Sequence, residues 1–195
     1  MSQDKIYFDP ANKQIHLTDN SSHLIWREAG PTPPVSYDDW FLPSRDETDA
    51  MRTNLYDSAI GDFGTGFLWT SSEASSSTAY GVRFSDGLKP GLAKSSNTPV
   101  RPARTFIDTV GTYEIGDVGP AGGWIFYISG GTTYYEAAPY DLNDPFINWS
   151  NIQNVAVTGT GTAIGTGASN TTKIIEQLSH TSSKAQSCVD LVIVT

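Results

Sequence analysis

The chain has 195 residues, enough for one well-formed hydrophobic core, and 38% of them are hydrophobic. Its formal net charge of −9 argues against general nucleic-acid binding, because such proteins use an excess of Lys and Arg to displace the counterions of phosphate groups. One cysteine cannot form an intrachain disulfide, and no apolar run approaches the roughly 18 residues of a membrane-spanning helix, so we expect no membrane insertion.

The first 35 residues predict short strands followed by a linker. Hydrophobic and polar residues alternate over 5–18 on either side of a turn-forming segment at 9–12, which predicts a β-hairpin. Residues 23–30 predict another short strand, and the prolines within 31–34 predict a stiff linker. We therefore expect residues 1–35 to form an N-terminal hairpin, an assembly arm and a linker. Because the N-terminus has no apolar signal core, we expect folding in a reducing cytoplasm.

The stretch "YDDWFLPSRDE" at 37–47 allows two interpretations, a carboxylate-rich site or a helix start. Ser44 and Glu47 have the spacing of a capping box, in which each side chain bonds the other residue's backbone amide. Apolar residues then recur at helical spacing up to residue 59. We favour the second interpretation, with the carboxylates serving as a cap and as surface groups.

Beyond Gly61 the pattern changes to short strands. Half-exposed antiparallel strands are predicted within 66–73, 78–87, 89–96 and 99–106, and a buried strand followed by another within 122–139. Residues 150–169 predict a loop. Residues 169–194 predict helix, with Ser169 or Asn170 as the cap and Ile174, Ile175 and Leu178 on one face. The Ser/Thr run at 181–183 is able to divide this region into two helices.

Two blocks of motifs resemble known proteins. Residues 24–104 contain, in order, "LIW", "DWFLPSRDE", "FLWTSSE", "AYGVRFSDG" and "VRPAR". This series resembles the Legionella collagen-like protein C-terminal domain family, which has the C-type-lectin-like fold of formylglycine-generating enzymes. Residues 115–191 resemble the segment that precedes "DWFLPS" in related bacterial and phage proteins. The motif order therefore resembles a circular permutation of the family pattern.

The resemblance implies an α+β, C-type-lectin-like fold with two helices, short antiparallel strands and long loops. It implies one domain over 36–195, in which 36–106 is the second half of the family pattern and 107–195 the first half. Closure within one chain would bring Thr195 close to residue 36, whereas closure between chains would give a swapped oligomer. We also expect the helix at 170–191 and the strand at 123–128 to pack against the tryptophan core, because residues 107–195 cannot bury their own apolar side chains.

The resemblance also implies which residues are structural and which contact a ligand. The expected core contains the residues Trp40, Leu42, Trp69, Phe84 and Trp124. The expected ligand-binding face lies within 70–104 and contains the residues Thr70, Ser72, Ser75, Ser77, Tyr80, Arg83, Lys89, Lys94 and Arg101.

The residue patterns do not favour catalysis or a metal site. Formylglycine-generating enzymes need a cysteine pair for copper, and this chain has only Cys188, which we interpret as a packed helix residue. His16, His23 and His180 lack metal-ligand spacing. The segment 142–144 lacks the partner motifs of calcium-binding lectins, and the glycine-rich 159–167 lacks the Lys of a phosphate-binding loop. We expect no catalytic residues, no metal and no cofactor.

The sequence has one local excess of positive charge. The residues concerned are Arg83, Lys89, Lys94, Arg101 and Arg104, against Asp86. They indicate either a solvated face or, as the adhesin relatives suggest, a site for an anionic glycan.

The expected function is a non-enzymatic display protein. We expect a bacteriophage virion component, such as a head or tail fibre, decoration or receptor-binding protein, assembled in the bacterial cytoplasm. Its partners would be sister subunits in a homo-oligomer, other virion proteins and a host-surface glycan or protein. Two alternatives stay open. One is a glycan-binding adhesin module on a bacterial surface, and the other is an assembly protein that binds only sister subunits.

Overall fold

The computed structural model describes residues 5–9, 14–18, 24–28 and 34–195, the first three segments by their backbone only. The chain divides into two compact units, Met1–Val35 and Ser36–Thr195. The predicted proline linker falls mainly on 31–33 and, like His23, lies outside the described residues. Each unit is considered by itself below.

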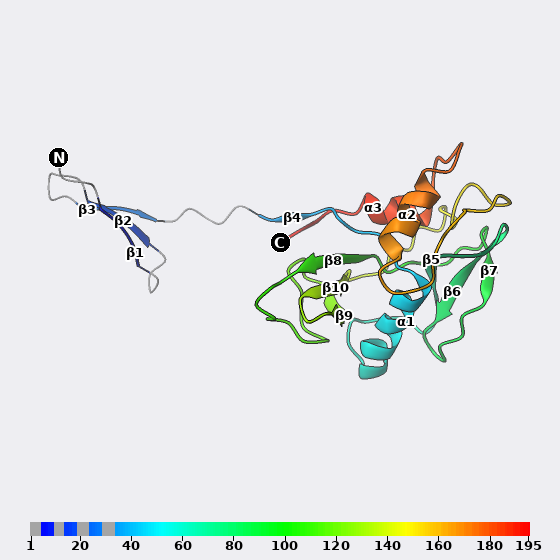
Figure 1. The fold of residues 1–195 in the computed structure, drawn as a ribbon, viewed down its shortest axis with the longest axis horizontal. Coiled ribbons are helices and arrows are strands. Elements are labelled where there is room, and N and C mark those ends of the chain that lie inside the picture. The colour runs from blue at the N-terminus through cyan, green and yellow to red at the C-terminus, as the bar shows by residue number, and fades with distance from the viewer. Residues whose placement is uncertain (1–4, 10–13, 19–23, 29–33) are drawn as a thin grey trace. The chain divides into compact units, whose positions relative to one another are not determined.

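The first unit contains an antiparallel sheet in the order β1-β2-β3 (Figure 1). Its strands are β1 (Lys5–Asp9), β2 (Gln14–Thr18) and β3 (Leu24–Glu28). Ile6 lies opposite Leu17, and Leu17 lies opposite Ile25. The hairpin predicted over 5–18 is therefore confirmed, and the next predicted strand joins it as the third strand of the sheet.

The second unit mixes helices with small antiparallel sheets, so the expected α+β class is confirmed. One sheet has the order β5-β6-β7 and another β8-β10-β9. In chain order the elements are β4 (Ser36–Tyr37), α1 (Arg45–Asn54), the 3-10 turn η1 (Tyr56–Ser58), β5 (Phe67–Ser75), β6 (Thr78–Arg83), β7 (Gly91–Ala93), β8 (Ala103–Ile107), β9 (Trp124–Ser129), β10 (Thr133–Ala137), α2 (Gly167–Ile175), α3 (Lys184–Val189) and β11 (Ile193–Val194).

The helix α1 starts with the predicted capping box. The Ser44 hydroxyl accepts from the Glu47 amide at 3.3 Å, and the Glu47 carboxylate accepts from the Ser44 amide at 2.7 Å. The inner face of α1 buries Met51 together with Leu55, the C-cap residue. Through this face α1 contacts strands of both larger sheets, β5 and β6 on one side and β9 on the other.

The C-terminal region forms two helices, as the Ser/Thr run allowed, but the predicted cap is wrong. The helix α2 begins at Gly167, so Ser169 and Asn170 lie inside its first turn, and α3 has Ser183 as its N-cap. Leu178 lies beyond the end of α2 and is 92% exposed, because the chain turns at Ser179, whose φ is 67°. The predicted apolar face is therefore limited to Ile174, which is buried, and Ile175, which is half-buried.

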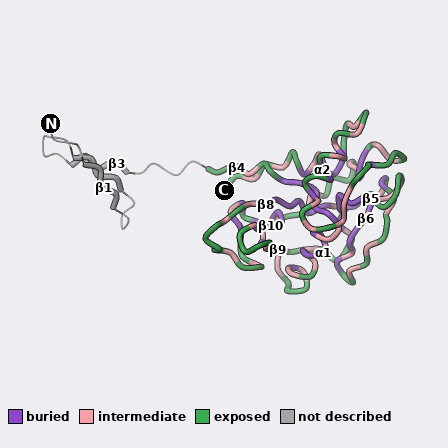
Figure 2. The backbone as a smooth tube through the Cα atoms, in the orientation of Figure 1, coloured by how far each residue is buried: buried purple, intermediate pink, exposed green. Residues whose placement is uncertain are grey.

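Four of the five predicted core residues are buried, and Figure 2 colours the backbone of the second unit by burial. Trp40, Leu42, Trp69 and Phe84 are buried, whereas Trp124 is half-buried at the edge of the core. Trp149, which the sequence did not single out, is fully buried, and its indole nitrogen donates to the Thr70 carbonyl at 2.7 Å.

The core joins the two halves of this unit. Leu42 and Trp69 share a cluster with Ile174, Ala185 and the buried Cys188. A second cluster packs Met51, Leu55 and Phe84 against Phe126 of β9. The expected packing of the 170–191 helices against Trp69 is therefore confirmed, whereas the 123–128 strand packs against the second cluster, in the same compact unit.

The two ends of the second unit pair with each other. β11 is antiparallel to β4, with Ile193 opposite Tyr37 and Val194 opposite Ser36. The end of the chain thus returns to residue 36 of the same molecule, and this unit is closed within one chain.

Candidate ligand-binding surface

The most exposed part of the predicted ligand face is the tip of the β5–β6 hairpin. Ser75 and Ser77 are exposed there, and the Ser75 and Thr78 hydroxyls lie 2.7 Å apart. The pairing register of β5 shifts between Trp69 and Glu73 and again between Glu73 and Ser75. Such irregularities bend a strand. The hairpin therefore carries a buried base and an exposed tip on the same two strands.

The structure divides the predicted ligand face into two groups. Ser75 and Ser77 are exposed, and Tyr80, Arg83 and Lys89 are half-buried. The other four predicted residues are buried and held by protein groups, so the prediction is wrong for them in this structure: Thr70, Ser72, Lys94 and Arg101.

Thr70 and Ser72 are buried because their hydroxyls hold the backbone of neighbouring segments. The Thr70 hydroxyl donates to the Tyr80 carbonyl at 2.8 Å, across the hairpin. The Ser72 hydroxyl donates to the Gly161 carbonyl at 2.7 Å and accepts from the Arg45 amide at 3.0 Å. Both hydroxyls therefore have structural partners.

Lys94 forms a buried ion pair close to the hairpin tip, where its backbone amide donates to the Ser77 carbonyl. Its ammonium lies 2.5 Å from the Glu73 carboxylate, donates to the Val155 carbonyl at 3.1 Å, and is 4.8 Å from the centre of the Trp149 ring. The Glu73 carboxylate also accepts from the Val157 amide at 3.0 Å. Lys94 therefore binds the 150–160 loop to the sheet.

Arg101 has a similar role on the other side of the core. Its guanidinium lies 2.5 Å from the Asp141 carboxylate and donates to the Gly61 and Ala138 carbonyls. It also lies 4.0 Å from the centre of the Phe63 ring. These contacts use the guanidinium in several directions at once, as its fork of donors permits.

Arg104 holds two carboxylates. It donates to Asp39 at 2.7 Å and to Glu136 at 3.0 Å. Glu136 is fully buried and also accepts from the Gly123 amide. Burial raises the pKa of Glu136, and the hydrogen bonds from Gly123 and Arg104 oppose that change.

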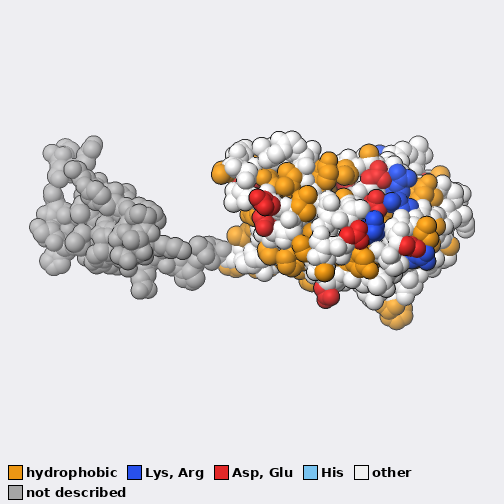
Figure 3. Space-filling view, turned by 90° about the horizontal axis from the view of Figure 1, so that it is seen from below, with side chains coloured by type: hydrophobic (Ala, Val, Ile, Leu, Met, Phe, Trp, Pro, Cys, Tyr) orange, Lys and Arg blue, Asp and Glu red, His pale blue; other side chains and the backbone are white. Residues whose placement is uncertain are grey.

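The apparent basic excess of 83–104 disappears in the folded chain. The two remaining cations of the stretch are also paired, Arg83 with Asp86 and Lys89 with Asp49, the latter at 2.9 Å. On the face shown in Figure 3, Lys and Arg side chains lie beside Asp and Glu side chains. All five cations thus have carboxylate partners, which weakens the interpretation of this stretch as an anionic-glycan site.

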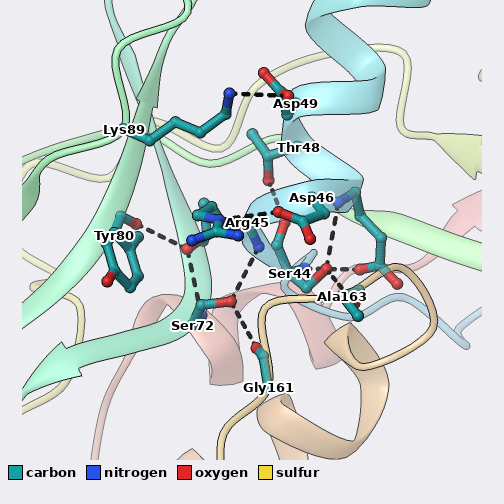
Figure 4. A network of polar contacts seen from close by, with 12 residues as sticks. Ser44, Arg45, Asp46, Thr48, Asp49, Ser72, Tyr80, Lys89, Gly161 and Ala163 are labelled. Carbon is teal, nitrogen blue, oxygen red and sulfur yellow. Dashed lines mark hydrogen bonds and ion pairs between the residues drawn. The ribbon is translucent and has the colours of Figure 1, made fainter.

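A polar network connects the hairpin to α1 and to the loop at 150–166, called the long loop below (Figure 4). The Ser44 hydroxyl donates to the Ala163 carbonyl at 2.9 Å, and the Arg45 guanidinium lies over the Tyr80 ring at 5.4 Å. The Asn170 side chain exchanges hydrogen bonds with both the amide and the carbonyl of Gly161 at 2.8 Å. Sequence reasoning missed Arg45 and the role of Asn170, because their partners lie in distant segments.

Glu47 departs from the expectation for the opening motif. It acts as a cap, as predicted, but it is fully buried and therefore not a surface group. Its carboxylate also accepts from the Gly165 amide at 2.8 Å. Burial raises the pKa of Glu47, against the lowering effect of the backbone hydrogen bonds. The motif at 37–47 therefore serves as scaffold that fixes the long loop.

Among the residues that the structure describes, no group of three or more His, Cys, Asp and Glu side chains could hold a metal ion. No helix in the described part of the chain is long and apolar enough to cross a membrane. Comparisons of the chain with protein-family models, curated proteins and solved structures gave no significant match.

Proposed function

We propose that the chain is a non-enzymatic virion protein of a bacteriophage, a head or tail fibre, decoration or receptor-binding component that presents a lectin-like face to the host surface. The observation that carries the proposal is the contrast within the β5–β6 hairpin. Its tip exposes Ser75 and Ser77, whereas Thr70 and Ser72 of the same hairpin are buried and bonded to Trp149 and Gly161, far away in the chain. A rigid scaffold with exposed loops is the usual design of a binding surface.

The proposed fold is a circularly permuted C-type-lectin-like domain. The motif series of 24–104 supports it, and so does the pairing of β11 with β4, which brings the chain end to residue 36. In this proposal residues 36–106 and 107–195 are the second and first halves of the family pattern. The fold gives no function by itself, so the proposal depends on the exposed surface.

The proposed binding surface is limited to the exposed and half-buried residues of the predicted face, together with Arg45. These are Arg45, Ser75, Ser77, Tyr80, Arg83 and Lys89. Because their cations are paired, the surface suits a neutral glycan or a polar protein patch better than a polyanion. Hydroxyl and phenol groups supply the hydrogen bonds and ring contact that such ligands need.

A cell-binding assay with the labelled full chain tests this surface. Tyr80→Ala and Ser77→Arg should each abolish binding to susceptible host cells and to any glycan that the unmodified protein retains. Thr109→Arg, at an exposed position on the loop after β8, is the matched control and should bind normally. Normal binding by both tip variants would contradict the proposed surface.

We propose that the first unit is an assembly arm for sister subunits. The order β1-β2-β3 leaves β1 and β3 at the edges of this described sheet, and a strand edge can pair with another chain. Native mass spectrometry should show a homo-oligomer that Ile25→Pro in β3 converts to monomer, since proline cannot donate to a strand ladder. A monomer at every concentration would contradict this role.

Labelling of intact phage particles would distinguish a virion component from an adhesin on the bacterial surface.

A further inference from the structure

A surface pocket of about 380 Å³ lies outside the hairpin tip and has no role in the function proposed above. It is lined by the residues Tyr56, Ala59, Ile60, Asp62 and Phe63. All five lie between α1 and β5. The volume is in the range of sites for small ligands or single side chains.

The backbone of this segment has an unusual conformation. Ala59 and Asp62 have φ values of 58° and 48°, in the left-handed region that is unfavourable for an alanine. Between them Gly61 has a φ of 88°, and a Cβ there would lie 2.6 Å from the Phe63 ring. Ala59 is therefore held in a conformation that it does not prefer locally, whereas Gly61 and Asp62 tolerate theirs.

Buried side chains fix the backbone of the pocket and one of its aromatic rings. The Arg101 guanidinium donates to the carbonyls of Gly61 and Asp62, and its charge is compensated by Asp141. The Phe63 ring stacks on Phe84, with ring centres 5.0 Å apart. A pocket fixed in this way loses little conformational freedom when a ligand binds.

One carboxylate of the lining is available to a ligand. Asp62 is exposed and forms no ion pair among the described residues, whereas Asp57 pairs with Arg52 at 3.1 Å. Tyr56, Ile60 and Asp62 thus place an unpaired carboxylate beside apolar groups, on a chain of net charge −9. This combination suits a ligand with a short alkyl stem and one positive charge.

We propose that this pocket binds a primary alkylammonium group, as found at the end of a lysine side chain of a partner protein. The ammonium would donate to the Asp62 carboxylate, and the alkyl stem would pack against Ile60 and Tyr56. A quaternary ammonium is a poorer fit because it needs open aromatic faces. The Phe63 ring is already covered by Arg101 at 4.0 Å and stacked on Phe84.

The test uses the full chain and Nα-acetyl-lysinamide as the probe, titrated by two-dimensional NMR. The amides of residues 56–63 should shift on binding, with a dissociation constant on the order of 1 mM. The probe acetylated on its side-chain nitrogen keeps the stem and loses the charge. It should bind at least tenfold more weakly, and so should tetramethylammonium.

Asp62→Asn is the informative variant, because asparagine also tolerates a positive φ. It should weaken binding of the lysine probe at least tenfold. Asp57→Asn, which removes a neighbouring carboxylate in the 3-10 helix η1, should leave binding unchanged. Thermal denaturation checks that both variants fold. Equal binding of charged and acetylated probes, or unchanged binding by Asp62→Asn, would overturn the proposal, and tighter binding of tetramethylammonium would reject the lysine assignment. These variants leave Ser77 and Tyr80 intact, so the host-binding proposal is tested separately.

Discussion

Two neighbouring regions of the chain, 83–89 and 94–104, carry the same kind of ion pair in different surroundings. Arg83 and Lys89 pair with carboxylates at the surface, with side chains 36% and 34% exposed. Lys94, Arg101 and Arg104 pair inside the domain, with side chains at most 7% exposed. In water the two charges of a pair are already well solvated, whereas in the interior each depends on its partner. The comparison teaches that burial, and not the number of charges, separates a structural cation from a surface one.

Arg104→Ala should have the largest effect on stability. It leaves Glu136 buried without its ion-pair partner, and removing one member of a buried pair costs about 3–5 kcal/mol. Urea denaturation followed by tryptophan fluorescence measures the loss. A cost near that of a surface pair would contradict the difference between the two regions.

Lys94→Ala should cost about 3 kcal/mol, at the lower end of the same range. Its partner Glu73 is 10% exposed and retains the hydrogen bond from the Val157 amide, so part of its charge stays compensated. The variant should also loosen the 150–160 loop. Hydrogen exchange at the Val157 amide should accelerate in Lys94→Ala and stay unchanged in Lys89→Ala.

Glu47→Gln tests a third case, a buried carboxylate that belongs to none of the ion pairs among the described residues. The variant replaces one acceptor oxygen by a donor, which should cost about 1–3 kcal/mol. Burial raises the folded-state pKa of Glu47 above its usual 4.5. The favourable contribution of protonated Glu47 is therefore full below about pH 4.5 and is lost as the pH rises through the raised pKa.

The expected pH effect is a difference between two curves. The unmodified protein should lose more stability than Glu47→Gln as the pH is raised from 4.5 to 7. Denaturant midpoints at both pH values give this difference. Glu136, whose pKa is also raised by burial, contributes to both curves and therefore cancels. Parallel curves would place Glu47 in a more polar environment than the structure does.

Ser44→Ala should cost about 1 kcal/mol through the loss of the helix cap. The hydroxyl also donates to the Ala163 carbonyl, so the loss includes one contact to the long loop. Host-cell binding should be unchanged once the difference in stability is taken into account. Lost binding at an unchanged melting temperature would mean that the 37–47 motif contacts the ligand.

Lys89→Ala should have the smallest effect, below about 1 kcal/mol, because its pair with Asp49 is partly exposed to solvent. The loss should shrink further in 1 M salt, which screens surface charges. A loss as large as that of Lys94→Ala would remove the distinction between the surface and buried regions.

Much of the fold could be predicted because its signals are local. The capping box of α1 involves residues three apart, and the strands of 5–18 and 67–83 alternate over a few residues. The error at α2 has the same origin. Asparagine is a residue type that favours the N-cap position. The Asn170 side chain is instead bonded to Gly161, nine residues earlier, and the helix begins at Gly167.

The candidate site was predicted less well, since exposure depends on partners that are far away in the chain. Thr70 and Ser72 belong to a run of hydroxyl residues that is typical of a surface, yet Trp149 bonds the Thr70 carbonyl and Gly161 bonds the Ser72 hydroxyl. Within the predicted face, the exposed Ser75 and Ser77 follow from the hairpin turn itself.

The sequence by itself determined where the helix α1 starts and where most of the strands of the larger sheets lie, because these depend on short hydrogen-bonded turns and on apolar patterning. Tertiary structure alone decided which charges are structural. Lys94, Arg101 and Arg104 have partners 21, 40 and 65 residues away, and Coulomb attraction between such groups becomes strong only when folding brings them together and removes water. A cluster of cations in a sequence therefore carries no information on how many remain free.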